Sequence, residues 1–320
     1  MMHGRIVRLA GIAVACLAMY GTPQPLAQSK AALATIRVVT PPLTNYTPLL
    51  VARDKGWFAE ENLSVTWSTV TQTAVSIEAV YGGSAEFGGG GVLEPMIARG
   101  NGLDLMLALP TARIRGAPPD NSGIAVRANS EIARAADLAG KRVSVGLINS
   151  INHIHMVEWL RKAGVDAKTV QFIEIPFPQM GDALLKSRLD AVWAVEPFMT
   201  IMKKSGDVRI LGYPYQENMP NMDLTAFFAK ETWLKANADV ARRFRRAYQR
   251  AVTHLNETSK DERDGWVAKF SGVKPELVAE MSLPVFPTEF SMPSLRANMN
   301  LGVAQRLIKP FDIETMVWKP

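Results

Sequence analysis

The sequence has almost no cysteine: Cys16 is the only one among 320 residues. It lies in an N-terminal leader-like segment, so the rest of the chain can form no disulfide, thiolate nucleophile or cysteine metal site. Histidine is also scarce, with four in the chain. His153 and His155 stand two apart in an expected helix and point to different faces, and His155 is expected to pair with Glu158 on the surface. We therefore expect no metal site and no cofactor.

Long apolar runs are missing as well. The run from Leu9 to Met19 is too short to span a bilayer, and no later stretch is long and apolar enough. This apolar run follows a basic start and precedes small residues. Residues 1–34 are therefore expected to be a signal peptide that is cleaved near Ala27 or Ala34. The expected location is the periplasm. A lipid anchor on Cys16 is the alternative.

No charge of one sign dominates the chain. The net charge is +6, but the leader holds three of the 36 basic residues and no acid, which leaves 33 basic against 30 acidic residues. This small, dispersed excess argues against nucleic acid as a partner. The motifs HExxH, GxSxG and the P-loop are also absent. We therefore expect a protein that is not an enzyme.

Strands and helices alternate from Lys141 to Phe198. The expected strands are Val143–Gly146, Val170–Ile175 and Ala191–Val195, with helices after Ser150 and from Met180. Short βα connections of this kind predict a parallel sheet flanked by helices. Ligand crevices in such sheets form at the carboxyl ends of the strands.

The same alternation precedes this stretch. Strands are expected at 36–39, 63–67, 86–87 and 103–109, a further strand at 224–229, and helices after Glu231. Two crossings rich in proline and glycine divide the chain. They predict an α/β fold of two lobes, each a mainly parallel sheet, joined by a hinge. Lobe I would comprise 35–117 and 222–320, and lobe II 118–221.

Four segments together resemble one family. The run Pro48–Leu63, PLLVARDKGWFAEENL, resembles the opening of substrate-binding proteins of ABC importers in the nitrate, sulfonate, taurine and thiamine-pyrimidine group. Tyr81–Gly88, Asp137–Val143 and Leu189–Pro197 fit the same family in the same order. The resemblance implies a type II periplasmic-binding-protein fold that closes over a small molecule and delivers it to an ABC permease in the inner membrane. It leaves the ligand open among anions, aromatic compounds and pyrimidines.

Two other functions stay open beside this one. One branch of the group resembles a pyrimidine synthase that consumes its own histidine and uses a cysteine-rich iron motif, which this chain lacks. A ligand sensor that docks on a membrane receptor is the other. We expect a monomer in either case.

The expected ligand contacts in lobe I follow its first three strands. Glycine lets backbone amides approach a ligand at a helix N-terminus, which favours an anion. The alternative is that the run of four glycines, Gly88–Gly91, forms only a tight turn between a strand and a helix. The residues are Asn45, Tyr46, Gln72, Thr73, Gly90 and Gly91.

Further contacts are expected from the first crossing and from lobe II. Arg113 could hold an anion by bidentate hydrogen bonds, or be a solvated loop residue. Ser150, Ile151 and Asn152 open a helix with free amides, although Ser150 alone could be a plain N-cap.

Two acids and an aromatic residue complete the expected site. Glu196 and Asp223 could accept hydrogen bonds from a ligand, whereas Glu196 could equally cap the next helix. Phe198 could stack on a ring beside Tyr46, as could Phe227 unless it is a core residue. The expected ligand is thus small and polar, and preferably an anion such as a sulfonate, carboxylate or aromatic acid.

Overall fold

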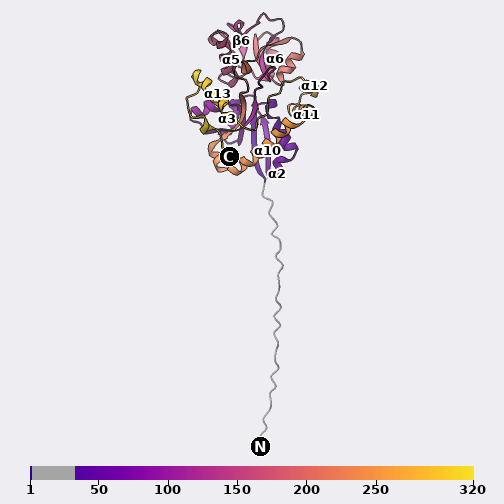
Figure 1. Ribbon diagram of the computed structural model, residues 1–320, viewed down its shortest axis with the longest axis vertical. Helices are drawn as coiled ribbons and strands as arrows, with labels where there is room; N and C mark the ends of the chain where they lie inside the picture. Colours follow the sequence, from indigo (N-terminus) through magenta and orange to yellow (C-terminus); the bar gives the residue numbers. More distant parts are fainter. Residues whose placement is uncertain (2–32) are drawn as a thin grey trace. The chain divides into compact units, whose positions relative to one another are not determined.

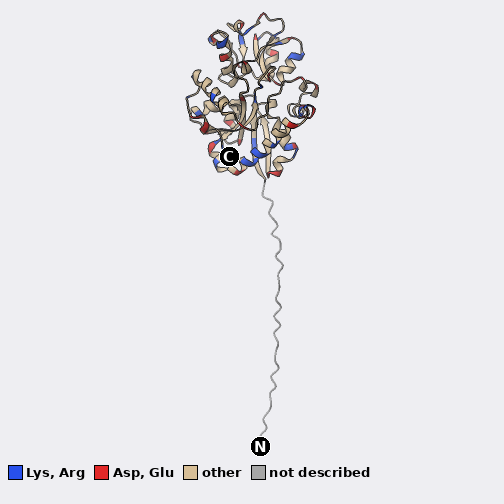
Figure 2. Cartoon of the chain, viewed as in Figure 1, with Lys and Arg blue, Asp and Glu red and all other residues tan. Residues whose placement is uncertain are grey.

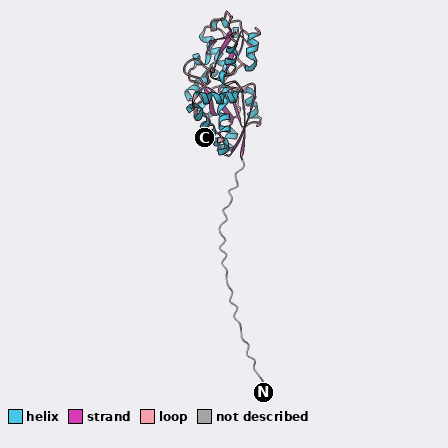
Figure 3. Cartoon of the chain, turned by 90° about the vertical axis from the view of Figure 1, so that its right-hand side faces the viewer, coloured by secondary structure: helices cyan, strands magenta, loops and turns pink. Residues whose placement is uncertain are grey.

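Two five-stranded sheets, each flanked by helices, make up residues 33–320 in the computed structural model (Figure 1). The structure describes Met1 and residues 33–320, so the expected signal peptide, its cleavage near Ala27 and the anchor on Cys16 lie outside the described residues. Figure 3 shows the strands in two tiers with helices around each. Basic and acidic residues are interspersed along the described part of the chain (Figure 2). Within the described range, no helix is long and apolar enough to cross a membrane.

The first sheet has the strand order β2-β1-β3-β10-β4. Strand β1 is parallel to β2 and β3, whereas β10 is antiparallel to both β3 and β4. A strand from the second half of the chain therefore lies inside the sheet built by the first half, as the expected discontinuous lobe requires. The strands are β1 (Ala34–Thr40), β2 (Leu63–Thr69), β3 (Phe87–Gly91), β4 (Leu105–Arg113) and β10 (Asp223–Lys230).

Nine helices of residues 47–304 accompany this sheet. The longest, α10, buries an apolar face that includes Phe244, which stacks on Phe58 and Phe87 at 5.4 and 4.6 Å between ring centres. Phe227 is fully buried among these rings, so it is a core residue. The helices are α1 (Thr47–Asp54), α2 (Trp57–Glu60), α3 (Thr73–Tyr81), α4 (Leu93–Gly100), α9 (Glu231–Ala236), α10 (Ala238–Glu257), α11 (Lys260–Ser271), α12 (Pro275–Val278) and α13 (Met292–Ala304).

The second sheet has the order β7-β6-β8-β5-β9, in which only β5 is antiparallel to its neighbours. The expected strand Val170–Ile175 shrinks to two residues. Both sheets are mainly parallel, which confirms the fold class; the lobe boundaries stay a prediction. The elements are β5 (Ser122–Arg127), β6 (Arg142–Ser144), α5 (Ile151–Lys162), β7 (Gln171–Phe172), α6 (Phe177–Leu185), β8 (Ala191–Val195), α7 (Phe198–Lys204), β9 (Val208–Gly212) and α8 (Pro214–Asn218).

The glycine run is the third strand itself, so it is neither the loop expected after residues 86–87 nor the tight strand-to-helix turn of the alternative. Gly88–Gly91 pair with β10, and the run is fully buried. A Cβ on Gly88 would lie 2.5 Å from the ring of Phe228, and one on Gly89 would lie 2.7 Å from the ring of Tyr46. Because neighbouring side chains fill the space where each Cβ would stand, only glycine fits this strand.

The C-terminal part is not helical throughout, contrary to expectation. Val285 forms a β-bridge with Arg113, which lies in β4 and not in a loop.

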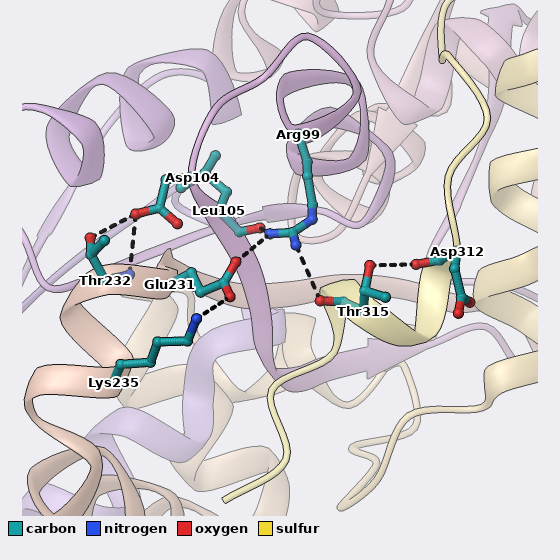
Figure 4. A network of polar contacts seen from close by, with 8 residues as sticks. All are labelled: Arg99, Asp104, Leu105, Glu231, Thr232, Lys235, Asp312 and Thr315. Atoms are coloured by element: carbon teal, nitrogen blue, oxygen red, sulfur yellow. Dashed lines mark hydrogen bonds and ion pairs between the residues drawn. The ribbon is translucent and has the colours of Figure 1, made fainter.

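Arg99 of α4 joins three segments of the chain by hydrogen bonds, as Figure 4 shows. Its guanidinium donates to the Leu105 carbonyl at 2.8 Å, the Glu231 carboxylate at 3.0 Å and the Thr315 carbonyl at 3.3 Å.

His155 lies in the interior, not on the surface as expected. Its exposed fraction is 0%, and its Nε2 lies 3.1 Å from Asn298 Oδ1 on α13. Glu158 pairs with Arg161 instead. The Gln305 amide also donates to the Ile154 carbonyl at 2.8 Å. These contacts join α5 to α13 and to the residue that follows it, and α13 packs on α4.

Replacing Gly88 by alanine should destabilise the protein by about 1–3 kcal/mol, because the methyl group meets both the Phe228 ring and the Ser76 carbonyl oxygen. Gly265 in α11 is the matched control, since a Cβ at that position would have no atom within 4 Å. Gly265→Ala should stabilise the helix by about 0.5–1 kcal/mol. Urea unfolding measures both, and equal effects would contradict the close packing of β3.

Burial lowers the pKa of His155 to about 4, so the folded protein keeps this imidazole neutral. The unfolded chain takes up a proton below about pH 6.5, and stability is therefore lost as the pH falls from 6.5 towards 4. His155→Gln removes this loss. The difference in unfolding free energy between wild type and variant should change by up to about 3 kcal/mol between pH 7 and pH 4. Parallel pH profiles in urea titrations would refute the assignment.

Candidate functional site

A cavity lies between the two sheets and is lined by residues of both. Sheet one contributes the segments after β1 and β2 and the carboxyl end of β3, and sheet two the segments after β6 and β8. Its volume, counted as space open to the centres of water molecules, is about 70 Å³. That is room for several waters or a small ligand. The expected residues that line it are Asn45, Tyr46, Gln72, Thr73, Gly90, Gly91, Ser150, Ile151, Asn152 and Glu196.

The other three expected residues are not part of the lining. Arg113 Nε donates to Asp223 Oδ1 at 2.7 Å, and its Nη2 donates to the Glu289 carbonyl at 2.8 Å. The other oxygen of Asp223 accepts from the Ser291 amide at 2.6 Å. Phe198 packs against two apolar clusters, one of which also includes residues of the first sheet. Arg113 and Asp223 thus satisfy each other and hold the segment before α13.

Glu94 is the main lining residue that the sequence did not reveal. It lies in the first turn of α4, three residues after the glycine strand, and only 9% of it is exposed. Burial raises the pKa of its carboxyl to about 7, and the nearby Ile151 amide and Thr73 hydroxyl only partly offset this rise. Its Oε2 has no hydrogen-bond partner in the part of the chain that the structure describes. An acid three residues after the glycine run was the available signal.

Glu196 lies at the carboxyl end of β8, with an exposed fraction of 2%. Its carboxylate accepts from the Thr200 amide at 3.1 Å, the Thr200 hydroxyl at 2.8 Å and, at 3.4 Å, the Ser282 amide. It therefore satisfies the first turn of α7, as the capping alternative supposed, and lines the cavity as well. Burial again raises the pKa of the carboxyl to about 7.

The polar groups of the lining are only partly engaged. Asn152 accepts from the Tyr215 hydroxyl and donates to the Val145 carbonyl at 3.1 Å, and Ser150 Oγ caps α5. Three further lining residues carry buried polar atoms without a hydrogen-bond partner among residues 33–320. These atoms are Tyr46 Oη, Asn121 Oδ1 and Ser122 Oγ.

The lining suits binding by hydrogen bonds. Its ionisable residues are Glu94, Glu196, Tyr46 and Tyr215, and burial raises the pKa of both tyrosines well above the usual value. None of the described lining residues is Lys, Arg or His. Across the described residues, no group of three or more His, Cys, Asp and Glu could hold a metal ion.

Known proteins are similar to this chain, among them two curated relatives and a solved structure. A putative ABC transporter periplasmic binding protein of Brachyspira hyodysenteriae is 32% identical to this chain in the aligned part. That part covers 28% of this chain and 25% of the relative's length. A putative aliphatic sulfonates-binding protein of Escherichia coli is 22% identical over 80% of each chain. The alkanesulfonate-binding protein SsuA from Xanthomonas axonopodis pv. citri, solved with MOPS bound, superposes with a TM-score of 0.77 at 21% identity, covering 91% of this chain and all of that one.

The solved neighbours confirm the expected two-lobe fold of periplasmic binding proteins. The family model described as NMT1/THI5 like matches residues 43–260, more than half of the chain. This match confirms the resemblance that the four sequence segments carry, and the chain belongs to the NMT1/THI5-like family.

Proposed function

We propose that this chain is an extracytoplasmic solute-binding protein, located in the periplasm, that captures a small polar molecule between its lobes and delivers it to an ABC permease. The observation that carries the proposal is the cavity: ten of the thirteen expected contact residues, from two sheets, line it. The relatives named as periplasmic and sulfonate-binding proteins support the same role.

Binding would act through closure of the lobes. A ligand that contacts residues of both sheets stabilises the closed arrangement relative to the open one. The unpartnered atoms of Tyr46, Asn121 and Ser122 supply hydrogen bonds that the protein itself does not complete. A wrong ligand would leave them desolvated and unpaired, which provides selectivity.

The residues that line the cavity do not favour the enzymatic alternative. The synthase branch requires a histidine that reacts, whereas His155 is buried against α13, and neither it nor His153 is a lining residue. A sensor would use the same cavity and differ only in its membrane partner.

Ligand binding should stabilise the protein by about 2.7 kcal/mol at a ligand concentration one hundred times Kd. A thermal-shift screen of carboxylates, sulfonates, nitrate, amines and pyrimidines measures this. For the best ligand, Asn121→Ala should weaken binding roughly tenfold, because it removes one hydrogen bond inside the cavity. Asn300→Ala, on the exposed side of α13, is the control and should bind normally. No shift with any compound, for protein that native mass spectrometry shows to be empty, would sink the proposal.

A further inference from the structure

The charge of the cavity narrows the class of ligand. Glu94 and Glu196 bring two buried carboxyl groups into the lining, one from each side. The nearest expected cation, Arg113, is held by Asp223 outside the lining, and Arg115 donates to the Leu283 carbonyl at 2.8 Å. An anion would therefore meet two acids and no side chain of opposite charge among the described lining residues. Like charges in a buried site repel strongly.

The α5 N-terminus, where an anion would be expected to bind, already faces a carboxyl group. A Cβ on Gly91 would meet Glu94 Oε2. It would also lie 2.7 Å from the side chain of Ile151. Glu94, Gly91 and the first residue of α5 are thus in close proximity. The Ile151 amide lowers the pKa of Glu94, as a helix N-terminus does for a nearby acid. The protein's own carboxyl group takes the place of an external anion there.

Among the unpartnered polar atoms of the lining, the hydroxyls of Tyr46 and Ser122 can donate or accept, whereas two oxygens can only accept. Glu94 Oε2 and Asn121 Oδ1 are buried without a partner among residues 33–320, and each carboxylate oxygen of Glu196 accepts from the protein while retaining capacity for more. Oxygen acceptors of this kind are satisfied by N–H groups. The carboxyls could serve an anion only by keeping their protons, and above pH 7 the ionised forms prevail because both pKa values are about 7.

We propose that the cavity binds a nitrogen compound of zero or positive charge, an amine, amidine or amino-substituted heterocycle, whose N–H groups donate to Glu94 and Glu196. This inference rests on the proposed solute-binding function. It replaces the anion that the helix N-termini and Arg113 favoured in the sequence. There are two reasons for this change of expected ligand. Arg113 does not line the cavity, and Glu94 does.

Calorimetry at pH 8 with matched pairs tests the charge preference. Acetamidine and methanesulfonate are of similar size, and benzamidine and benzenesulfonate share a ring. The amidines should bind, and each sulfonate should bind at least a hundredfold more weakly. Tighter binding of the sulfonates would overturn the inference and leave the solute-binding function standing. Absence of binding by all four, with no small molecule released on denaturation, would count against the function and the inference together.

Two isosteric variants locate the contact. Glu94→Gln and Glu196→Gln keep the side-chain shape, and each should weaken amidine binding tenfold or more, because a charged acceptor is lost. Glu78→Gln removes the same charge from the exposed face of α3, and should bind amidines as the wild type does. Thermal unfolding without ligand verifies that all three are folded. Unchanged amidine affinity in both cavity variants would overturn the inference, since binding would then lie elsewhere.

Discussion

Close packing around a strand without side chains is the constraint on which the site depends. At Gly88–Gly91, neighbours occupy the space of each missing Cβ: the Phe228 ring, the Tyr46 ring, Thr73 and the Glu94 carboxyl. The last three of these residues line the cavity. Backbone that carried side chains would push them apart, since buried cores have no spare volume to absorb a methyl group. The glycines therefore position the residues around the cavity, and Gly90 and Gly91 line it themselves.

The sequence predicted the positions of loops well and the partners of charges poorly. Residues that follow strands, such as Asn45, Thr73 and Ser150, line the cavity because parallel strands deliver their loops to one edge of a sheet. That rule needs only the order of elements. The rule applies without knowledge of which strands are neighbours in the sheet. For the same reason, the two-lobe α/β fold could be predicted from the sequence.

Long-range pairing was the part that local patterns could not supply. Arg113 and Asp223 are 110 residues apart, and the antiparallel pairing of β4 with β10 joins them. His155 is buried between Asn298 of α13 and Tyr215 of α8, and the positions of these helices along the chain give no hint that they cover it. The periodicity of apolar residues predicts that one face of a helix is covered. Which element covers that face depends on tertiary packing, which the periodicity does not predict. The strand character of the glycines escaped for the same reason, because β10 supplies both the hydrogen bonds and the ring that fills the gap.

The buried acids of the cavity carry a cost in stability. Removing a carboxylate from water is unfavourable unless hydrogen bonds compensate, and the raised pKa values of Glu94 and Glu196 express that imbalance. Thr200 and Ser282 relieve Glu196, whereas Glu94 Oε2 has no such partner within residues 33–320. A ligand that donates hydrogen bonds gains more from an unsatisfied acceptor than from one already paired, because binding also removes the desolvation penalty. In the proposed binding role, a ligand without donors would add its own desolvation to that of the acids, and the same burial would therefore exclude it.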